Sequence, residues 1–168
     1  MAERVLTIDL VRHMKAKNRQ KWTAPQDERP LSKLGLRQAV FHADALLAGE
    51  RIEAIYTSPA VRCRATIAPM AEQLGVEARV EPLLAEGRSS QEAMRLLGSL
   101  RERHESGRIV LCSHGDTIPA MLAGIGAENG ASAPAGLSGF GGWYRVRFDG
   151  DGATIVRFGA PEGFPAGK

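Results

Sequence analysis

The chain has 168 residues, of which 43% are hydrophobic and 24% are charged, and its formal net charge is +3. These values are typical of a folded globular protein and exclude a largely disordered chain. The length is sufficient to bury one sizeable core, so we expect a single domain over residues 1–168. The small positive charge favours anionic partners in general and is weak evidence for nucleic acid.

The N-terminus and the cysteines bear on the location of the protein. The sequence has no run approaching the roughly 18 apolar residues that a membrane-spanning helix needs. Its first residues, "MAERVLTIDLVRH", lack the charged, then apolar, then small-residue order of a signal peptide. Cys63 and Cys112 fit packed, reduced thiols better than a disulfide framework. We therefore expect a cytoplasmic protein without a membrane partner.

The first predicted elements are a strand and a helix. Residues 5–11, "VLTIDLV", are too continuously apolar to alternate and predict a strand covered on both faces. Ser32 is an expected N-cap and Gly49 an expected left-handed residue after the helix between them. The apolar residues of this helix recur at helical spacing and are Leu36, Val40, Ala43 and Leu47.

Two further strand and helix pairs follow. Residues 53–58 predict a second strand, and residues 60–74 predict a helix that ends at Gly75. Residues 77–81 predict a third, short strand. The pattern from Ser89 to Glu92 is a capping box ahead of an amphipathic helix.

The last third of the chain predicts a fourth strand and a hairpin. Residues 108–116 form the strand, which ends on charged residues, and residues 117–125 form a short helix. The Gly-rich segment 124–142 is expected to be a loop, acting as a mobile lid or a spacer. Residues 143–148 and 154–158 predict a hairpin turned by "DGDG". The predicted fold is an α/β three-layer αβα sandwich with a mostly parallel central sheet and a C-terminal antiparallel hairpin.

Basic residues follow the strands of this sheet. In such sheets the carboxyl ends of the parallel strands share one edge, where ligands bind. The first strand ends at Arg12 and His13, the helix after the second begins near Arg62, and the fourth ends at His114. We expect these four residues to converge. A phosphoryl group fits such a cluster, because guanidinium groups bind its oxygens through paired hydrogen bonds and a protonated imidazole donates to another oxygen.

Five ordered sequence blocks resemble the histidine phosphatase superfamily, also called phosphoglycerate-mutase-like. The blocks are "LVRHMKA" at 10–16, "RPLSKLGLRQA" at 29–39, "IYTSPAVRCRAT" at 55–66, "LLAEG" at 83–87 and "VLCSHGDTIPAML" at 110–122. The first block is similar to the short branch that reads RHAKA, which includes phosphohistidine phosphatases and phosphatase domains attached to some bacterial Nudix hydrolases. The Nudix box itself is missing here. Met14 stands where many members have glycine, a difference expected to reshape the pocket floor.

The resemblance implies a role for each site residue. His13 would be the nucleophile, Arg12 and Arg62 would clamp the phosphate, and His114 would be the second phosphate-binding histidine. Glu86 would protonate the leaving oxygen and then activate water. The residues support this chemistry, because a neutral imidazole whose tautomer is fixed by a hydrogen bond can attack phosphorus and form phosphohistidine. We expect a metal-independent phosphatase that hydrolyses phosphomonoesters and needs no cofactor.

The basic loop "KAKNRQKW" at 15–22 has three interpretations. It is a solvated loop without a function, a substrate rim, or a nucleic-acid patch. As a rim, Lys15 and Arg19 would bind additional phosphates and Trp22 would stack on a base, which favours a nucleotide or polyphosphate. As a nucleic-acid patch it lacks a repeated aromatic platform. We expect a small phosphorylated substrate and no nucleic acid polymer.

Two alternatives to this function stay open. One is a phosphohistidine protein phosphatase, with a phosphoprotein as its partner. The other is a noncatalytic phosphate-binding module, for which Met14 is the best support. A mutase is less favoured, because the chain after Glu86 has room for one helix and lacks an insertion that would close over a small phosphorylated acid. His42, His104 and Arg64 are expected at the surface, and the oligomeric state is left open.

Overall fold

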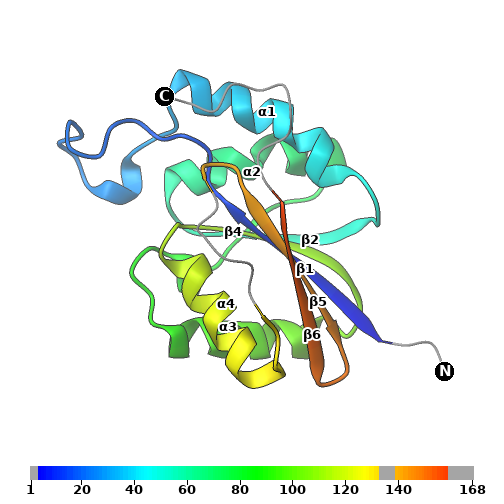
Figure 1. Ribbon diagram of the computed structural model, residues 1–168. Helices are drawn as coiled ribbons and strands as arrows, with labels where there is room; N and C mark the ends of the chain where they lie inside the picture. Colours follow the sequence, from blue (N-terminus) through cyan, green and yellow to red (C-terminus); the bar gives the residue numbers. More distant parts are fainter. Residues whose placement is uncertain (1–3, 133–138, 159–168) are drawn as a thin grey trace.

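The computed structural model describes residues 4–132 and 139–158, and these residues form a six-stranded sheet with helices on both faces (Figure 1). The strands are β1 (Val5–Arg12), β2 (Ile52–Thr57), β3 (Arg79–Val80), β4 (Gly107–Ser113), β5 (Trp143–Asp149) and β6 (Gly152–Phe158). Their order in the sheet is β3-β2-β4-β1-β5-β6. The first four strands run parallel, whereas β5 is antiparallel to both β1 and β6. The predicted parallel sheet with a C-terminal hairpin is confirmed.

The helices are α1 (Lys33–Leu47), α2 (Val61–Leu74), α3 (Ser90–Arg103) and α4 (Thr117–Asn129), with short 3-10 turns η1 (Gln26–Glu28) and η2 (Pro82–Leu84). The starts of α1 and α3 and the end of α2 lie at the residues that local signals predict. Ser32 caps α1 by accepting from the amide of Gly35 at 3.0 Å. Gly75 ends α2 with a φ of 67°, and Ser89 and Glu92 form the expected capping box of α3.

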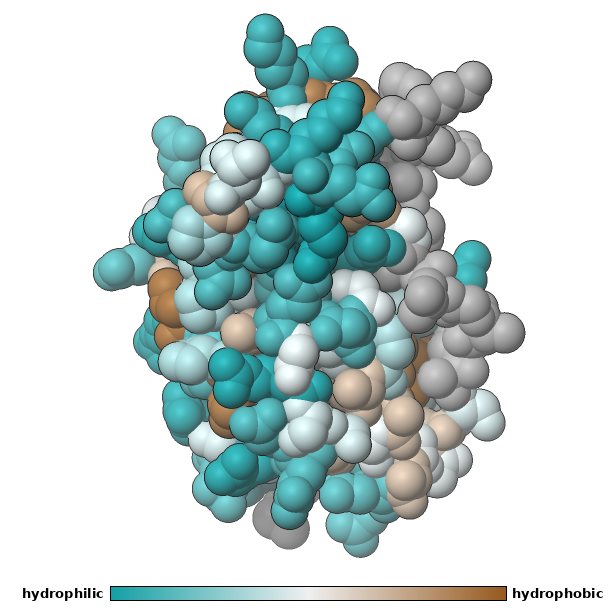
Figure 2. All heavy atoms as spheres, turned by 90° about the vertical axis from the view of Figure 1, so that its left-hand side faces the viewer, coloured by the Kyte–Doolittle hydropathy of each residue, from teal (hydrophilic) through white to brown (hydrophobic). Residues whose placement is uncertain are grey.

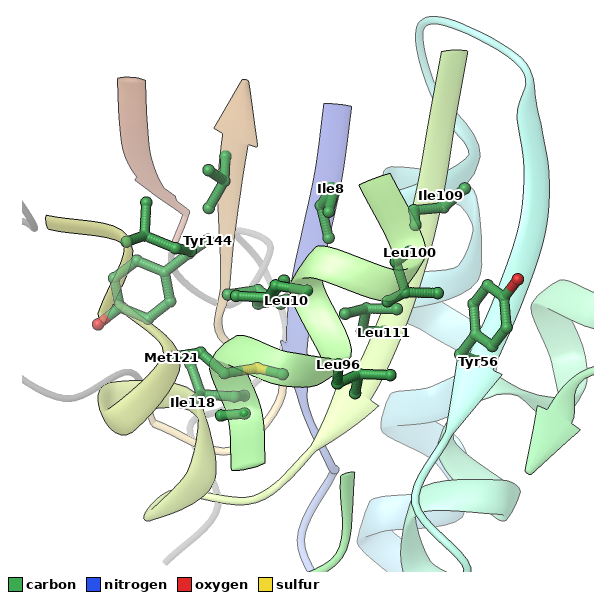
Figure 3. Close-up of a cluster of buried hydrophobic side chains, with 14 of the residues drawn as sticks. Ile8, Leu10, Tyr56, Leu96, Leu100, Ile109, Leu111, Ile118, Met121 and Tyr144 are labelled. Carbon is green, nitrogen blue, oxygen red and sulfur yellow. The ribbon is translucent and has the colours of Figure 1, made fainter. Parts of the chain in front are cut away.

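The sheet separates two hydrophobic cores, since successive side chains of a strand point to opposite faces. Ile8 and Leu10 of β1 point toward α3 and α4 (Figure 3), and Leu6 belongs to the same core. On the other face, α1 and α2 pack over the second core, which contains Cys63 and Cys112. Both cysteines are buried, as the sequence predicted. These two packed faces make the three layers seen in Figure 1.

The buried face of α1 differs from the predicted one. Leu36 and Val40 are 51% and 62% exposed, so the predicted apolar stripe is wrong at these two positions. The helix instead packs through its small residues. A Cβ atom at Gly35 would lie 2.0 Å from the carbonyl oxygen of Lys15, so this close approach of two backbones requires glycine.

Two histidines expected at the surface are not there. His42 is 1% exposed, because the packing of α1 through its small residues turns this side chain inward. His104 is half-buried after the end of α3, and its Nε2 atom lies 2.8 Å from the hydroxyl of Tyr56. Arg64 is exposed, as expected.

The loop predicted over residues 124–142 is helical at its start, since α4 continues to Asn129. Gly124 lies within this helix and leaves room for Met94 of α3, since a Cβ atom there would lie 2.2 Å from the Met94 sulfur. Gly130 ends the helix with a φ of 66°. The lid or spacer prediction falls partly on 133–138, which lie outside the described residues.

A buried ion pair ties α1 to the sheet. Asp9 of β1 is fully buried and accepts from Nε of Arg108 at 2.8 Å and from Nε of Arg145 at 2.8 Å. Arg108 also donates to the carbonyl groups of Leu46, Ala48 and Glu50 at the end of α1. Within the two described ranges, the structure contains no helix with the length and apolar character needed to cross a membrane.

Candidate active site

The carboxyl ends of β1 and β4 lie at one edge of the sheet, because these strands pair in parallel with Arg12 opposite Ser113. His13 and His114 follow directly, and their ring centroids are 5.5 Å apart. Arg62 lies in the first turn of α2, and its Nη2 atom is 3.2 Å from Nδ1 of His114. The structure thus brings together the four residues that the sequence placed at this edge.

A cavity of about 460 Å³ is lined by Arg12 and His13, whereas Arg62 and His114 are buried and do not belong to its lining. Figure 2 shows the side of the molecule that faces left in Figure 1, where the polar loop before α1 lies, and hydrophilic residues dominate this side. The basic residues that line the cavity are Arg12, Lys15, Lys17, Arg19 and Arg29, and the acidic ones are Glu86 and Asp116. The excess of positive charge favours an anionic ligand.

His13 is held as a neutral imidazole. Its Nδ1 atom lies 2.7 Å from the carbonyl oxygen of Met14, to which it donates, so the lone pair is on Nε2. Burial first, and then the positive charges of His114, Arg62 and Arg12, lower the pKa of His13 to about 3, against the hydrogen bond to Met14, which raises it. A neutral ring with a defined tautomer is the form that can act as a nucleophile.

Arg62 is fully buried and has one donor without a partner. Its Nη1 atom donates to the carbonyl of Gln26 at 2.7 Å, and its Nη2 atom donates to Glu86 at 3.0 Å and to His114 at 3.2 Å. In the part of the chain that the structure describes, the buried Nε–H has no acceptor. A buried donor without an acceptor is costly, so this guanidinium is prepared to bind a further anionic oxygen.

Ser58 orients His114 and was not assigned a role from the sequence. Its hydroxyl lies 2.8 Å from Nε2 of His114, while Nδ1 of the same ring accepts from Arg62. The hydroxyl of Ser58 and the guanidinium of Arg62 thus hold the ring from its two nitrogens. The amide of Ala60 also donates to this hydroxyl, at 3.2 Å. The block "IYTSPAVRCRAT" contained the signal, as a serine between a strand and a helix.

Arg12 is held between Gly115 and Phe140. A Cβ atom at Gly115 would lie 3.0 Å from Cζ of Arg12, so the glycine gives the guanidinium room to approach the backbone. Arg12 stacks on the Phe140 ring at 4.4 Å, and the centroid of that ring is 5.6 Å from that of His13. Burial lowers the pKa of Arg12. Phe140, which lines the cavity, was also missed by sequence reasoning, because the Gly-rich segment around it has no periodic pattern.

Glu86 lies in the site and bridges two guanidinium groups. Its two carboxylate oxygens accept from Arg62 at 3.0 Å and from Nη2 of Arg19. Arg62 is completely buried, whereas the side chain of Arg19 is half exposed. In this arrangement the carboxylate is a counter-ion for Arg62.

The basic loop lies partly along the cavity. Lys15 and Arg19 line it, in agreement with their placement on a substrate rim. Trp22 does not belong to the lining, and its indole Nε1 donates to the carbonyl of Pro25 at 3.0 Å. Arg29 lines the cavity and was not singled out from the sequence.

Met14 lies outside the cavity. Its side chain is fully buried and packs in a small cluster with Leu31 and Ala39, and its amide donates to the Thr66 hydroxyl at 2.9 Å. A Cβ atom at Gly141 would lie 2.5 Å from the Met14 sulfur. The side chain thus does not form the floor of the cavity, contrary to the expectation from the sequence.

In residues 4–132 and 139–158, no group of three or more His, Cys, Asp or Glu side chains has an arrangement that could hold a metal ion. The positive charge of the site described above comes from guanidinium and ammonium groups.

Comparison with known proteins gives related sequences and folds. Residues 8–90 match the sequence profile of the histidine phosphatase superfamily (branch 1). An 8-oxo-(d)GTP phosphatase of Mycolicibacterium smegmatis is 32% identical over 117 residues, which are 69% of this chain and 36% of that protein. The chain therefore spans little more than a third of that relative's length.

Two solved structures show the same fold. The protein histidine phosphatase SixA, complexed with tungstate, superposes with a TM-score of 0.73 at 19% identity, covering 92% of this chain and 97% of that chain. YhfR of Bacillus stearothermophilus superposes with a TM-score of 0.77 at 17% identity, covering 95% and 100%.

Proposed function

The chain belongs to the histidine phosphatase superfamily, and from this premise we propose that it is a metal-independent phosphatase that hydrolyses phosphomonoesters through a phosphohistidine at His13. The observation that carries the proposal is the state of His13. Its ring is neutral, its tautomer leaves the Nε2 lone pair for attack, and it lies between cationic groups. Nucleophile and phosphate-binding groups are thus present together.

The first chemical step forms the phosphoenzyme. Nε2 of His13 attacks phosphorus, the N–P bond forms, and the P–O bond to the leaving group breaks. Arg12 and Arg62 donate to the phosphoryl oxygens, on which negative charge is spread in the transition state, and His114 binds the phosphoryl group beside them. Removing one such donor typically lowers kcat by about 10²- to 10³-fold.

Glu86 is the group proposed to move protons. The incoming phosphoryl group displaces its carboxylate from Arg62, because a phosphoryl group offers this guanidinium more acceptor oxygens and more charge. The released carboxylate takes up a proton from solvent as the substrate binds and gives this proton to the leaving oxygen. In the second step the carboxylate takes a proton from water, the oxygen of this water attacks phosphorus, and the N–P bond breaks with its electron pair returning to His13.

A nucleotide or another small phosphorylated metabolite is the proposed substrate. The cavity is lined by more cationic groups than one phosphoryl group can contact. This supports a ligand that carries further negative charge. The curated relative named as an 8-oxo-(d)GTP phosphatase acts on a nucleotide and supports this class.

A phosphohistidine protein phosphatase is the second candidate, and Phe140 is the observation that favours it. The ring is 38% exposed and lies beside His13. A planar leaving group bonded directly to phosphorus, such as imidazole, would contact this ring during the reaction. The noncatalytic module loses its main support, since Met14 does not line the cavity.

Phosphate release in the presence of a chelator tests the proposed function. The substrates are p-nitrophenyl phosphate, nucleotides, sugar phosphates and a phosphohistidine peptide, and the proteins are wild type, His13→Ala and His104→Ala. His104 is a matched control, because it is a half-buried histidine that does not line the cavity. We expect activity in wild type and His104→Ala and its loss in His13→Ala. Equal activity in wild type and His13→Ala, or activity that needs an added metal, would refute the mechanism.

A further inference from the structure

Arg29 is a buried arginine in the loop before α1, and the mechanism above leaves it without a role. It is 6% exposed and lines the same cavity as His13. Its Nε atom donates to the side-chain oxygen of Gln26 at 2.9 Å, and its Nη1 atom donates to the carbonyl of Lys17 at 2.8 Å. Within the described part of the chain, the Nη2 group has no hydrogen-bond partner.

The partners of Arg29 do not neutralise its charge. Both are neutral oxygens, whereas the other buried guanidiniums, Arg62 and Arg108, each contact a carboxylate. Burial, and then the charges of Arg62 and Arg19, lower the pKa of Arg29, with Glu86 acting in the opposite direction. A buried charge without a counter-ion is unfavourable. The free protein therefore holds a cation that an anionic ligand would stabilise.

One residue holds this cation next to the phosphoryl site. Gln26 accepts from Arg62 through its backbone oxygen and from Arg29 through its side-chain oxygen. The two guanidiniums are thus fixed relative to each other by a short turn. An anion bound by Arg29 would be a neighbour of the phosphoryl group bound by Arg62.

We propose that Arg29 is a specificity-determining residue that binds a second phosphoryl group, carried by the leaving group of the substrate. The preferred substrates would be those in which the transferred phosphoryl group is followed by another phosphate, as an anhydride or as a separate ester. This inference rests on the proposed phosphatase function and adds the class of leaving group. Arg29 supplies binding energy away from the reacting phosphorus, so its loss raises KM more than it lowers kcat.

Three substrates with one nucleoside test this proposal. They are the 5′-monophosphate, the 5′-diphosphate and the 3′,5′-bisphosphate, and the proteins are wild type, Arg29→Gln, Arg29→Lys and Arg64→Gln. Arg64 is a matched control, since it is exposed and does not line the cavity. In wild type we expect a higher kcat/KM for a substrate with two phosphates than for the monophosphate. In Arg29→Gln this ratio should fall by roughly 10- to 100-fold, as for a lost hydrogen bond to a charged group.

The ratio separates this role from a structural one. If Arg29 only positions the loop, Arg29→Gln lowers kcat/KM equally for all three substrates, and that result would overturn the proposal. Arg29→Lys keeps the charge and should retain part of the preference. The diphosphate and the bisphosphate distinguish an anhydride-linked second phosphate from an ester-linked one. Failure of the phosphatase function itself would appear separately, as activity toward the monophosphate that does not depend on His13.

A binding measurement tests the same subsite without turnover. Inorganic phosphate and pyrophosphate are titrated calorimetrically into wild type and Arg29→Gln in the presence of chelator. We expect pyrophosphate to bind wild type at least about 10-fold more tightly than phosphate, and this preference to disappear in Arg29→Gln. A preference that survives the substitution would contradict the assignment of Arg29.

Discussion

Acidification is expected to destabilise the protein through His13, and replacing His13 by glutamine is expected to remove this contribution. Burial first, and then the charges of His114, Arg62 and Arg12, lower the pKa of His13 from 6.5 to about 3. Above pH 6.5 the group is neutral in both the folded and unfolded states and has no effect on stability. As the pH falls from 6.5 toward 3, only the unfolded state binds the proton, so stability is lost.

The magnitude at pH 5 follows from the two pKa values. At this pH the unfolded state is favoured by a factor of roughly 30 through protonation of His13, which corresponds to about 2 kcal/mol. Glutamine is a suitable replacement, because it can still form hydrogen bonds and does not titrate. The free energy of unfolding of wild type minus that of His13→Gln should therefore fall by about 2 kcal/mol between pH 8 and pH 5.

Urea unfolding at pH 8, 7, 6 and 5 measures this difference. The remaining histidines are present in both proteins, so their titration largely cancels. A parallel NMR titration of the imidazole reports the protonation of His13 directly and should show a neutral ring at pH 5. A difference in unfolding free energy that stays constant over this range, or a ring that protonates near pH 6.5, would refute the neutral nucleophile on which the mechanism depends.

Three substitutions test other parts of the structure. Asp9→Asn leaves the buried guanidinium of Arg108 and the partly exposed one of Arg145 without their carboxylate and should lower the free energy of unfolding by about 3–5 kcal/mol in urea denaturation; a loss below about 1 kcal/mol would contradict this. Ser58→Ala removes the partner of His114 and should lower kcat/KM by roughly 10- to 100-fold in steady-state assays, whereas an unchanged kcat/KM would exclude the orienting role. Gly115→Ala places a methyl group against Arg12 and should weaken phosphate or vanadate binding by about 10-fold or more in calorimetry; equal affinity would show that the guanidinium can move aside without loss.

Each of these variants has a matched control on the surface. Asp149→Asn removes an exposed carboxylate of β5, and Ser106→Ala removes an exposed hydroxyl before β4. Gly98→Ala adds a methyl group within α3 at a position where nothing lies within 4 Å of the new Cβ atom. We expect a change within about 0.5 kcal/mol in stability for Asp149→Asn, an unchanged kcat/KM for Ser106→Ala and an unchanged ligand affinity for Gly98→Ala.

The alternation of strands and helices was sufficient to place the residues of the candidate site. Parallel strands present their carboxyl ends at one edge, so Arg12, His13 and His114 had to lie close together once β1 and β4 were neighbours. Helix ends were also predictable, because capping depends on residues close in sequence, such as Ser32 and Gly75. These features need no knowledge of distant contacts.

The orientation of α1 could not be predicted in the same way. Leu36 and Val40 gave a helical apolar spacing, but the helix packs through Gly35 and His42 on another face. The choice depends on how closely the backbone of Lys15 approaches the helix, which is a tertiary contact. The spacing of hydrophobic residues does not predict where two backbones approach closely, and such places require small residues.

A similar limit separates the reaction from the substrate. The groups proposed for chemistry are placed by strands and a helix, where regular hydrogen bonding fixes their positions, so a reaction class could be proposed from the sequence. Arg29 belongs to an irregular loop and is held by contacts to Gln26 and Lys17. Such contacts cannot be predicted from a periodic sequence pattern. A residue such as Arg29 would bind the leaving group and would not contact the reacting phosphorus. Sequence changes in loops could therefore alter substrate specificity while the residues proposed for the chemistry stay the same. Resemblance in the site therefore supports a shared reaction, and the substrate must be sought in the loop between β1 and α1.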